Sequence, residues 1–311
     1  MAPLHPLPRE LERTLQILEN LPKYGKRQWL KGTRTQYPRF IYRYMDPKIL
    51  DEHLSDYFVE SYFYLNSVAD FNDPFDMGAY VTINDDPKKR REKFNKILKA
   101  HRPELNWKRR REASNKLMCA PDQLPNIRAA YEKGVRNMGA ICFTTKPGNL
   151  LMWSHYADHH RGFALQFHIA NDIRTLSRLL KVNYSDVYPI IDWTDDTQKT
   201  LEKVLSMKGR GWEYEEEFRI FVVDAAKTYL SFQPEALTGL IFGCRASMEL
   251  KERVLNILER RASKNLSPVK VYKAVKHPRE YSVKIQKDLS LKWPSLTISS
   301  CSRRDRISPA D

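Results

Sequence analysis

Two short stretches of the chain place titratable residues inside apolar, strand-forming runs. Residues 141–167 read ICFTTKPGNLLMWSHYADHHRGFALQF and hold Trp, Tyr, His, Asp and Arg between two apolar segments. Residues 212–221 read WEYEEEFRIF and bring four acids into a strand-forming run of a basic protein. Burying ionisable groups costs free energy unless they are paired or hydrogen-bonded, so such groups are either well satisfied or functional. Both stretches are therefore candidate parts of a site.

The alternation in the second stretch predicts a β-strand that starts at Trp212. One face of this strand would carry Glu213, Glu215, Glu217 and Arg219. Acids that enter an apolar strand are a local conflict of the kind found at functional sites. The other interpretation of Glu217 is an ion pair with an Arg or Lys of a neighbouring strand, and the sequence leaves both open.

The first stretch predicts a helix over residues 150–158, capped by Asn149. His155 and His159 are four residues apart in the sequence, which is one possible zinc spacing. The HExxH glutamate and paired cysteines are missing, so no metal is predicted. Ser154 lies outside a GxSxG motif, and the chain has neither a GxGxxG nor a Walker motif. These histidines are expected to satisfy backbone groups or to contact a ligand.

The composition favours a partner that carries negative charge. The 311 residues have a net charge of +15, which is typical of proteins that bind nucleic acid, nucleotides or phosphorylated ligands. The first residues lack the apolar core of a secretory signal, and no run approaches membrane-spanning length. The four cysteines show no CxxC spacing. A soluble, cytoplasmic protein with no membrane segment is expected.

Residues 86–116 contain thirteen Lys or Arg against four acids, which is +9 of the total charge of +15. This segment is expected to be a basic helical insertion that contacts nucleic-acid phosphates in a sequence-independent way. A solvated helical face is the alternative. The candidate contacts are Lys88, Arg90, Arg91, Lys108, Arg109, Arg110 and Arg111.

The spacing of strand-like and helix-like segments predicts one α+β domain over residues 38–287. We expect a mixed or antiparallel central sheet with helices around it. Strand candidates include residues 40–44, 57–65, 139–145 and 162–167. The basic insertion would occupy 86–135. Residues 1–37 are expected to form a short helix and a basic linker, and residues 288–311 a disordered tail.

Several sequence blocks occur together in a known order. They are FNDPFD, then CFT, then LMWSHYADHHRGF, and finally WEYEEEFR. Over residues 40–245 this order resembles a mostly bacterial family of unknown function, DUF2971. The chain departs from that pattern at Thr144, where the family usually has Ser, and in its long basic segment.

The order of elements is also similar to that of ADP-ribosyltransferases, particularly toxin-like enzymes that modify DNA. This resemblance implies an ADP-ribosyltransferase-like fold and NAD as substrate. It further implies modification of nucleic acid or protein, in the role of a toxin or phage-defence effector. Cleavage of the nicotinamide glycosidic bond creates an oxocarbenium-like centre that a carboxylate can stabilise.

The same resemblance implies roles for individual residues. Glu217 would be the catalytic carboxylate, and His155 or Tyr156 would position the acceptor. Arg43 would bind the NAD phosphates, and Tyr64 would stack on nicotinamide. Further residues implied in NAD binding are Tyr42, Asn72, Asp73 and Arg219.

Two other functions remain open from the sequence. One is a metal-dependent nuclease that would use Asp73, Asp76, His155 and Glu217 around a divalent ion. The other is a non-enzymatic module that binds nucleic acid through the basic segment. Consumption of NAD would indicate the transferase, and degradation of nucleic acid that chelation blocks would indicate the nuclease. Binding of nucleic acid without either reaction would indicate the binding module.

Overall fold

The computed structural model describes residues 37–49, 56–119 and 124–288, with the single residues Gln16, Asn20, Lys26 and His53. The helix and linker predicted over residues 1–37, and the tail predicted over 288–311, therefore lie almost entirely outside the described residues.

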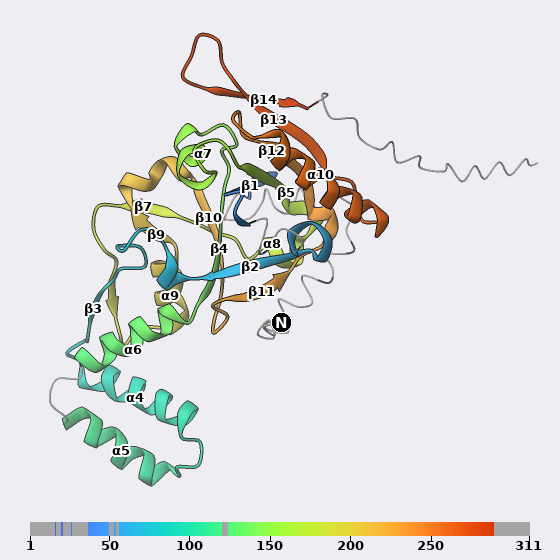
Figure 1. Ribbon diagram of the computed structural model, residues 1–311. Helices are drawn as coiled ribbons and strands as arrows, with labels where there is room; N and C mark the ends of the chain where they lie inside the picture. The colour runs from blue at the N-terminus through green and yellow to red at the C-terminus, as the bar shows by residue number, and fades with distance from the viewer. Residues whose placement is uncertain are drawn as a thin grey trace, which may run out of the picture.

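A mixed ten-stranded sheet forms the centre of the described structure (Figure 1). Its strands are β1 (Phe40–Met45), β2 (Tyr62–Ser67), β4 (Gly139–Thr144), β5 (Phe163–His168), β6 (Leu180–Lys181), β10 (Glu217–Val222), β11 (Thr228–Ser231), β12 (Leu237–Phe242), β13 (Lys270–Lys276) and β14 (Val283–Lys287). The main order is β11-β2-β4-β1-β5-β12-β13-β14, with β10 paired to β4 and β6 paired to β10. The β12–β13 pair is parallel and the other pairs of this sheet are antiparallel. The α+β class with a mixed central sheet is thus confirmed.

Alternation along the central strands gives the sheet two apolar faces. Ile41 and Met45 of β1 belong to the largest core cluster, which also contains residues of α8 (Ile173–Leu176) and α10 (Met248–Ser263). Tyr44 belongs to a second cluster with Trp153 of α7 (Leu150–Tyr156). Successive residues of a strand point to opposite faces, so α7 and α10 cover opposite sides of β1.

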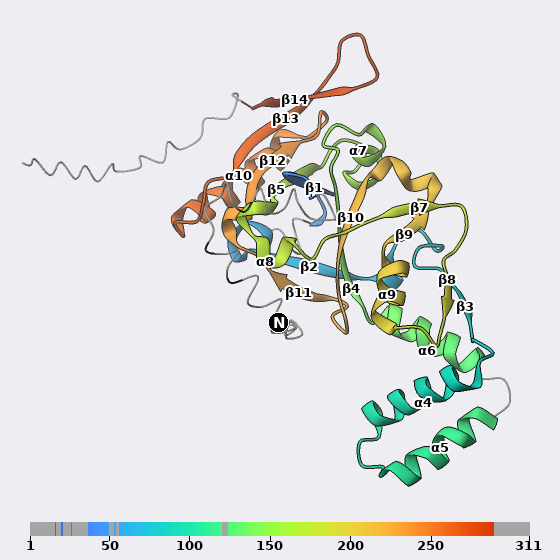
Figure 2. The same cartoon turned by 180° about the vertical axis from the view of Figure 1, so that it is seen from behind.

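The end of the molecule beyond β4 is built from short elements (Figure 2). Two short parallel pairs lie here, β3 (Tyr80–Thr82) with β8 (Ile190–Asp192) and β7 (Asn183–Ser185) with β9 (Met207–Gly209). The helices at this end are α6 (Leu124–Arg136) and α9 (Thr197–Leu205), and they share a core cluster with the loop after β2. Among the described helices, none offers an apolar stretch of membrane-spanning length.

The central sheet is split at β4. This strand pairs with β10 along its whole length, while its other edge is shared between β2, at its first two residues, and β1, at Thr144. Among the residues that the structure describes, residues 141–143 therefore pair with a strand only on the edge of β4 that faces β10. Arg43 Nη1 donates to the carbonyl oxygen of Cys142 at 3.1 Å. A side chain thus occupies an edge that a strand would otherwise cover.

The strand predicted over residues 57–65 is wrong in its first half. Residues Asp56–Glu60 form the π-helix η1, Ser61 has a φ of 58°, and β2 begins at Tyr62. The three apolar residues that open the predicted strand are 0–4% exposed. A strand sends successive side chains to opposite faces, whereas the π-helix buries three consecutive apolar residues in the core.

The basic segment forms a helical hairpin of α4 (Pro87–His101) and α5 (Trp107–Cys119) that projects from the body (Figure 1). On each helix, partly or fully buried residues recur at spacings of three and four. These are Arg90, Lys93, Phe94, Asn95, Ile97 and Leu98 in α4, and Arg110, Ala113, Ser114, Leu117 and Met118 in α5. Ten of the thirteen Lys and Arg residues of the segment are consequently exposed.

The hairpin is attached to the body mainly through α4. The ring of Phe94 lies 4.9 Å from that of Trp193, and Lys93 Nζ donates to the carbonyl oxygen of Asp195 at 2.7 Å. The insertion predicted over residues 86–135 thus consists of this projecting hairpin and of α6, which packs on the body through Tyr131 and Val135.

Candidate functional site

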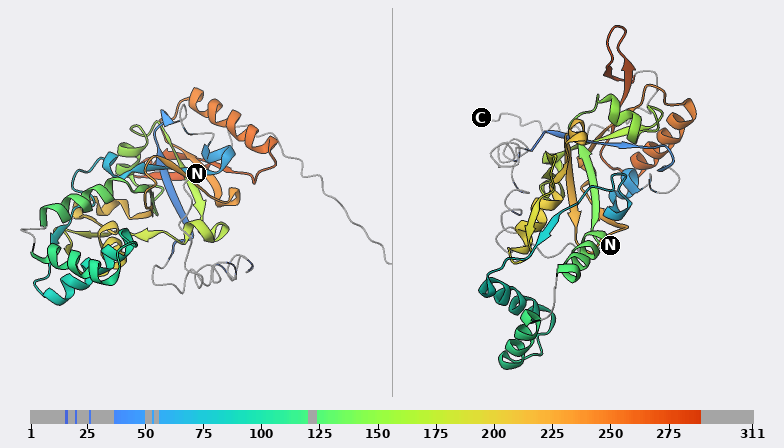
Figure 3. Two further views of the ribbon diagram at one scale, coloured as in Figure 1. Left: turned by 90° about the horizontal axis from the view of Figure 1, so that it is seen from below. Right: turned by 90° about the vertical axis from the view of Figure 1, so that its left-hand side faces the viewer.

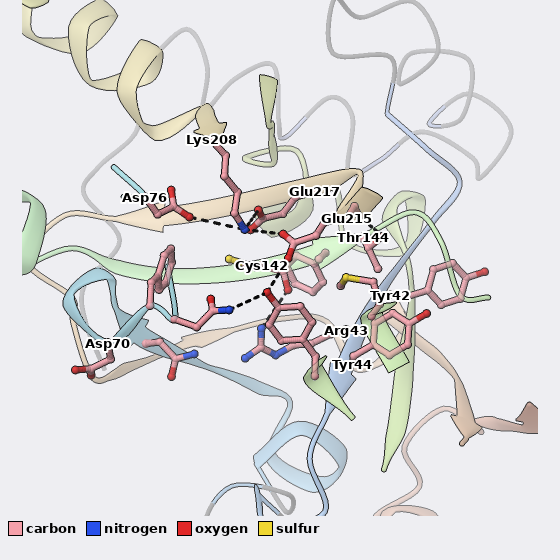
Figure 4. Close-up of a pocket in the computed structure, with 16 residues that line it drawn as sticks. Tyr42, Arg43, Tyr44, Asp70, Asp76, Cys142, Thr144, Lys208, Glu215 and Glu217 are labelled. Atoms are coloured by element: carbon pink, nitrogen blue, oxygen red, sulfur yellow. Dashed lines mark hydrogen bonds and ion pairs between the residues drawn. The ribbon is translucent and has the colours of Figure 1, made fainter. Parts of the chain in front are cut away.

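The split in the sheet opens into a pocket of about 260 Å³. Its lining comes from β1, from β2 and the segment that follows it to Asp76, from β4, from α7, and from residues 208–217. Figure 4 shows the charged side chains of the last group pointing toward one another beside Cys142 and Thr144. Segments that are far apart in the sequence therefore meet at one place.

The acidic run enters the site as a turn and not as a strand. The alternation predicts a strand from Trp212, but residues Arg210–Glu215 form a 3-10 helix, and β10 begins at Glu217. Between them Glu216 adopts a left-handed conformation with a φ of 43°. This turn places both Glu215 and Glu217 in the pocket lining and leaves Glu216 exposed.

Lys208 is the cation that the two buried acids share. Its Nζ lies 2.6 Å from Glu215 Oε2, 3.1 Å from Glu217 Oε2 and 3.8 Å from Asp76 Oδ2 (Figure 4). The Lys208 side chain is 4% exposed and lies 4.8 Å from the Trp212 ring centroid. Burial lowers the pKa of this lysine, but Glu217 and Glu215 outweigh burial and hold the pKa above its usual value. Lys208 is therefore a fixed positive charge.

Arg219 forms a second, fully buried bridge. Its guanidinium donates to both carboxylate oxygens of Glu217 at 2.8 Å, and to those of Asp76 at 2.9 and 2.6 Å. The Arg219 side chain is 0% exposed. This paired geometry ties the loop after β2 to β10 and is the stronger form of ion pairing. The three carboxylates and two cations of the network leave one net negative charge.

Tyr156 of α7 completes the site opposite the acidic turn. Its hydroxyl donates to Glu215 Oε1 at 2.6 Å and accepts from Asn72 Nδ2 at 3.3 Å. Asn149 caps α7 through its Oδ1 and also donates from Nδ2 to the carbonyl oxygen of Tyr214 at 2.6 Å. The same residue therefore begins the helix and attaches it to the turn that carries Glu215.

The two pocket carboxyls have pKa values shifted in opposite directions. Burial raises the pKa of Glu215, Lys208 opposes this effect, Glu217 adds to it, and the net change is upward. Burial also raises the pKa of Glu217, but Arg219 and Lys208 outweigh it and lower this pKa to about 2. The Glu217 carboxyl therefore stays ionised, while the Glu215 carboxylate is the stronger base of the two. Two carboxyls separated in this way are typical of acid–base sites.

Five of the residues predicted for the site line the pocket. They are Tyr42, Arg43, Asn72, Tyr156 and Glu217. Arg43 is half-buried, and its Nε is shielded from solvent with no hydrogen-bond partner among the described residues. An arginine carries several donors in a planar array that suits phosphate or carboxylate oxygens. The unsatisfied Nε shows that this side chain retains donor capacity.

Two predicted residues lie away from the pocket. His155 is exposed on α7, with its ring 6.3 Å from that of Tyr214. Tyr64 of β2 stacks on the His53 ring at a centroid distance of 4.2 Å and an interplanar angle of 15°. Neither side chain is part of the pocket lining.

Asp73 and Arg219 are buried in structural positions. Asp73 Oδ1 accepts from the backbone N–H of Phe75 at 2.9 Å, so this carboxylate stabilises its own turn. Arg219 contacts the site through Asp76 and Glu217 and does not line the pocket. The ion pair that the sequence left open for Glu217 is thus present, with a cation from its own strand and one from β9.

The residues considered for a nuclease are not brought together as a set. Asp76 and Glu217 are both bound by Arg219, while His155 and Asp73 are not part of the pocket lining. Within the described part of the chain, no group of three or more His, Cys, Asp or Glu side chains is arranged to hold a metal ion.

Sequence reasoning missed Lys208 and gave no role to Glu215. Residues 208–211 read KGRG, which predicts a flexible basic hinge, because lysine and glycine are typical of exposed loops. In the structure Lys208 belongs to β9 and is buried. The available indication was the group of acids itself, since buried carboxylates need a nearby cation.

Part of the chain that forms this site matches a known protein family. Residues 152–220 match the model of the family described as Protein of unknown function (DUF2971). The predicted resemblance to DUF2971 is confirmed over that segment, which is shorter than the 40–245 expected. The DUF2971 match begins in α7 and ends in β10, so it includes Tyr156, Lys208, Glu215 and Glu217. No curated protein and no solved structure matches the chain.

Proposed function

We propose that this protein is an ADP-ribosyltransferase-like enzyme that uses NAD to modify nucleic acid. The observation that carries the proposal is the pair Glu215 and Glu217. Both line one pocket, and their pKa values are shifted in opposite directions. Cleavage of an N-glycosidic bond followed by transfer needs one carboxylate that stays charged and one group that accepts a proton.

Glu217 is suited to stabilise the positive charge that develops on the ribose. The bond between ribose C1′ and the nicotinamide nitrogen breaks, and its electron pair leaves with nicotinamide. The remaining sugar is oxocarbenium-like. With a pKa of about 2, Glu217 is ionised at any physiological pH, and the buried network around it carries one net negative charge while Glu215 is ionised. A fixed charge that needs no rearrangement is the most effective kind of electrostatic stabilisation.

Glu215 is suited to accept the proton of the attacking group. As the acceptor's nucleophilic atom bonds to C1′, its proton passes to Glu215 and then to solvent. The raised pKa of Glu215 makes its carboxylate a stronger base than an ordinary glutamate. Burial raises the pKa of Tyr156 well above its usual value, so its hydroxyl keeps its proton and orients the Glu215 carboxylate.

Arg43 provides the donors for the phosphates of NAD. Its buried, unsatisfied Nε and its position in the pocket fit an anionic ligand. The half-buried ring of Tyr42 lines the same pocket and offers an aromatic surface to a base. At about 260 Å³ the pocket is slightly below the usual range for drug-sized ligands. It therefore suits the reacting end of a dinucleotide, with the rest extending outside.

The α4–α5 hairpin supports nucleic acid as the acceptor. Lys88, Arg91, Lys108, Arg109 and Arg111 are exposed on it, while Arg90 and Arg110 are half-buried. Trp107 is 69% exposed, with the Arg111 guanidinium 5.4 Å from its ring centroid. Clustered cations on a projecting element favour phosphate contacts that do not depend on sequence.

The chemistry is tested by incubating the full chain with labelled NAD and with DNA, RNA or a protein extract. We expect nicotinamide release and transfer of label, reduced about 100-fold or more by Glu215→Gln. Glu216→Gln is the matched control, because the Glu216 side chain is 49% exposed and forms a surface ion pair with Lys146. Absence of NAD consumption with every acceptor would overturn the proposal.

The acceptor is tested with a variant in which Lys88, Arg91, Lys108 and Arg109 are replaced by Gln. We expect label transfer to nucleic acid to fall, while hydrolysis of NAD by water is unchanged. Equal loss of both reactions, or transfer to protein alone, would contradict nucleic acid as the acceptor.

Consumption of NAD with modification of nucleic acid would be harmful to a cell, which supports the role of a toxin or phage-defence effector. We expect expression of the wild-type chain to arrest growth and the Glu215→Gln variant to be tolerated. Growth arrest by both chains would contradict this role.

A further inference from the structure

The β13–β14 hairpin is a second basic projection with no assigned role. Residues 270–287 contain six Lys or Arg and one acid, Glu280. Lys270, Lys276, Arg279, Lys284 and Lys287 are exposed. In Figure 3 this hairpin and the α4–α5 hairpin project from opposite ends of the molecule. The strands that line the pocket lie between them in Figure 1.

A tyrosine is presented at the tip of this hairpin. Tyr281 has a relative exposure of 101%, the highest among the exposed large hydrophobic residues of the described chain. The tip that carries it is ordered by hydrogen bonds. The backbone N–H of His277 donates to the carbonyl oxygen of Ser282 at 2.9 Å, and that of Ser282 donates to the carbonyl oxygen of Glu280 at 2.8 Å.

The acid next to Tyr281 in the sequence, Glu280, is engaged by other residues of the tip. Glu280 Oε2 lies 3.6 Å from His277 Nδ1 and accepts from Ser282 Oγ at 3.4 Å, so this carboxylate is turned toward its own loop. Lys276 and Lys284 flank the tip on the two strands, because Lys276 is opposite Val283 and Lys284 is opposite Val275. The tip therefore combines an exposed aromatic ring with cations on both sides.

We propose that the β13–β14 hairpin binds single-stranded nucleic acid, with Tyr281 stacking on a base and Lys276 and Lys284 contacting the phosphates. Stacking on an exposed aromatic ring between cations is a common way to hold single strands, and it tolerates any base. A duplex keeps its bases covered, so a ring that stacks on bases favours single strands.

Protection of the sheet edge against pairing with another chain explains some of the exposed residues of this hairpin but not Tyr281. β14 ends the sheet order, and lysines on an edge strand prevent pairing with another chain. That accounts for Lys284 and Lys287. It does not account for an ordered tip that exposes the whole Tyr281 side chain, which gains nothing in the isolated protein from being placed there.

The test measures binding of fluorescent single strands to the full chain at low salt without NAD, so its outcome is independent of the pocket chemistry. The probes are oligothymidylate, oligouridylate and an abasic oligomer of the same length and charge. We expect Tyr281→Ala to weaken binding of both base-bearing strands by about 5-fold to 100-fold. Binding of the abasic oligomer should be unchanged, and Tyr281→Phe should bind like wild type.

Two further variants separate stacking from charge. Lys276→Gln and Lys284→Gln should each weaken all three probes and reduce the salt slope by about 0.7, because each variant removes one cation that neutralises a phosphate. Tyr188→Ala, which removes a tyrosine that is 49% exposed in a body loop, is the control and should bind like wild type. Strands containing iodouracil should crosslink to Tyr281 on irradiation.

Four outcomes would overturn the proposal, three in the binding measurements and one in the crosslinking. The first three are no binding by the wild-type chain at low salt, equal binding by Tyr281→Ala and wild type, and equal loss by Tyr281→Ala on base-bearing and abasic strands. Crosslinks that map only to other residues would also overturn it.

Discussion

The Tyr156 hydroxyl donates to Glu215 Oε1 over 2.6 Å and thereby joins helix α7 to the turn before β10. The bond connects the two sequence stretches whose residue types alone indicate a functional site. It also lowers the pKa of Glu215, in opposition to the net upward shift produced by burial and Glu217. The strength of Glu215 as a base therefore depends on a side chain from another element.

Tyr156→Phe should reduce transfer without unfolding the protein, because it removes one hydroxyl and keeps the ring. Glu215 acts as a base when ionised, so activity should rise with pH through its pKa. Loss of the hydrogen bond raises that pKa further, and the rising limb should move to higher pH. The measurement is the pH profile of NAD consumption for both chains. If the rate falls but the rising limb of the pH profile stays at the same pH, the Tyr156 hydroxyl does not control the pKa of the catalytic base.

Glu217→Gln should destabilise the protein by about 3–5 kcal/mol at neutral pH, since Arg219 and Lys208 lose a shared buried partner. The pKa of Glu217 is lowered from 4.5 to about 2 in the folded state. Its stabilisation is therefore present above pH 4.5 and is lost as the pH falls toward 2.

Denaturant unfolding of wild type and Glu217→Gln at a series of pH values checks this prediction. The difference between the two free energies of unfolding should narrow below pH 4.5. Glu216→Gln, on the exposed neighbour, should cost at most about 1 kcal/mol. A difference for Glu217→Gln that stays constant from neutral pH to pH 3 would show that its charge is not what stabilises the fold.

Arg261 should be essential for stability although it is remote from the pocket. Its buried guanidinium donates to the carbonyl oxygens of Phe58, Pro234 and Ser267 at 2.6, 2.7 and 2.7 Å. Arg261→Met would leave these carbonyls unsatisfied and should cost about 3 kcal/mol or more. Arg260→Met, one residue earlier and exposed, should stay within about 0.5 kcal/mol of wild type. Chemical denaturation measures the free energy of unfolding of both variants. A similar loss in Arg261→Met and Arg260→Met would contradict the role of Arg261.

Two glycines should respond to alanine with opposite signs. A Cβ at Gly162 would lie 2.2 Å from the carbonyl oxygen of Met45, so β1 would have to shift, at a cost of about 1–3 kcal/mol. A Cβ at Gly134, in α6, would meet nothing within 4 Å, and Ala there should stabilise by about 0.5–1 kcal/mol. Calorimetric unfolding of Gly162→Ala and Gly134→Ala measures the change in the free energy of unfolding for each variant. Changes of the same sign in both variants would contradict the prediction.

The central strands could be predicted from the sequence because their pattern is local. The apolar runs at residues 139–145 and 162–167 correspond to β4 and β5 within one residue at each end. The helix capped by Asn149 was likewise predictable from a single residue type. These features depend on the spacing of side chains along the chain, which the sequence contains directly.

The candidate site was predictable only in part. Arg43, Tyr156 and Glu217 line the pocket as expected, whereas Tyr64 stacks on His53 outside it. The alternation from Trp212 predicts a strand where the chain forms a 3-10 turn. Which aromatic or charged residue faces a pocket depends on strand order and on splits between strands, and neither is encoded in a local pattern.

The run of acids in an apolar segment already predicts that cations must balance the buried carboxylates. Which cations do so depends on how the chain folds. Asp76 reaches Arg219 from the loop after β2, far away in the sequence, whereas Lys208 precedes Glu215 by seven residues and meets it because the chain turns between them. Glu215 and Glu217 are two residues apart and chemically identical, so their residue type alone does not separate their pKa values. Their difference arises because Arg219 binds Glu217 directly while Tyr156 is the neutral partner of Glu215.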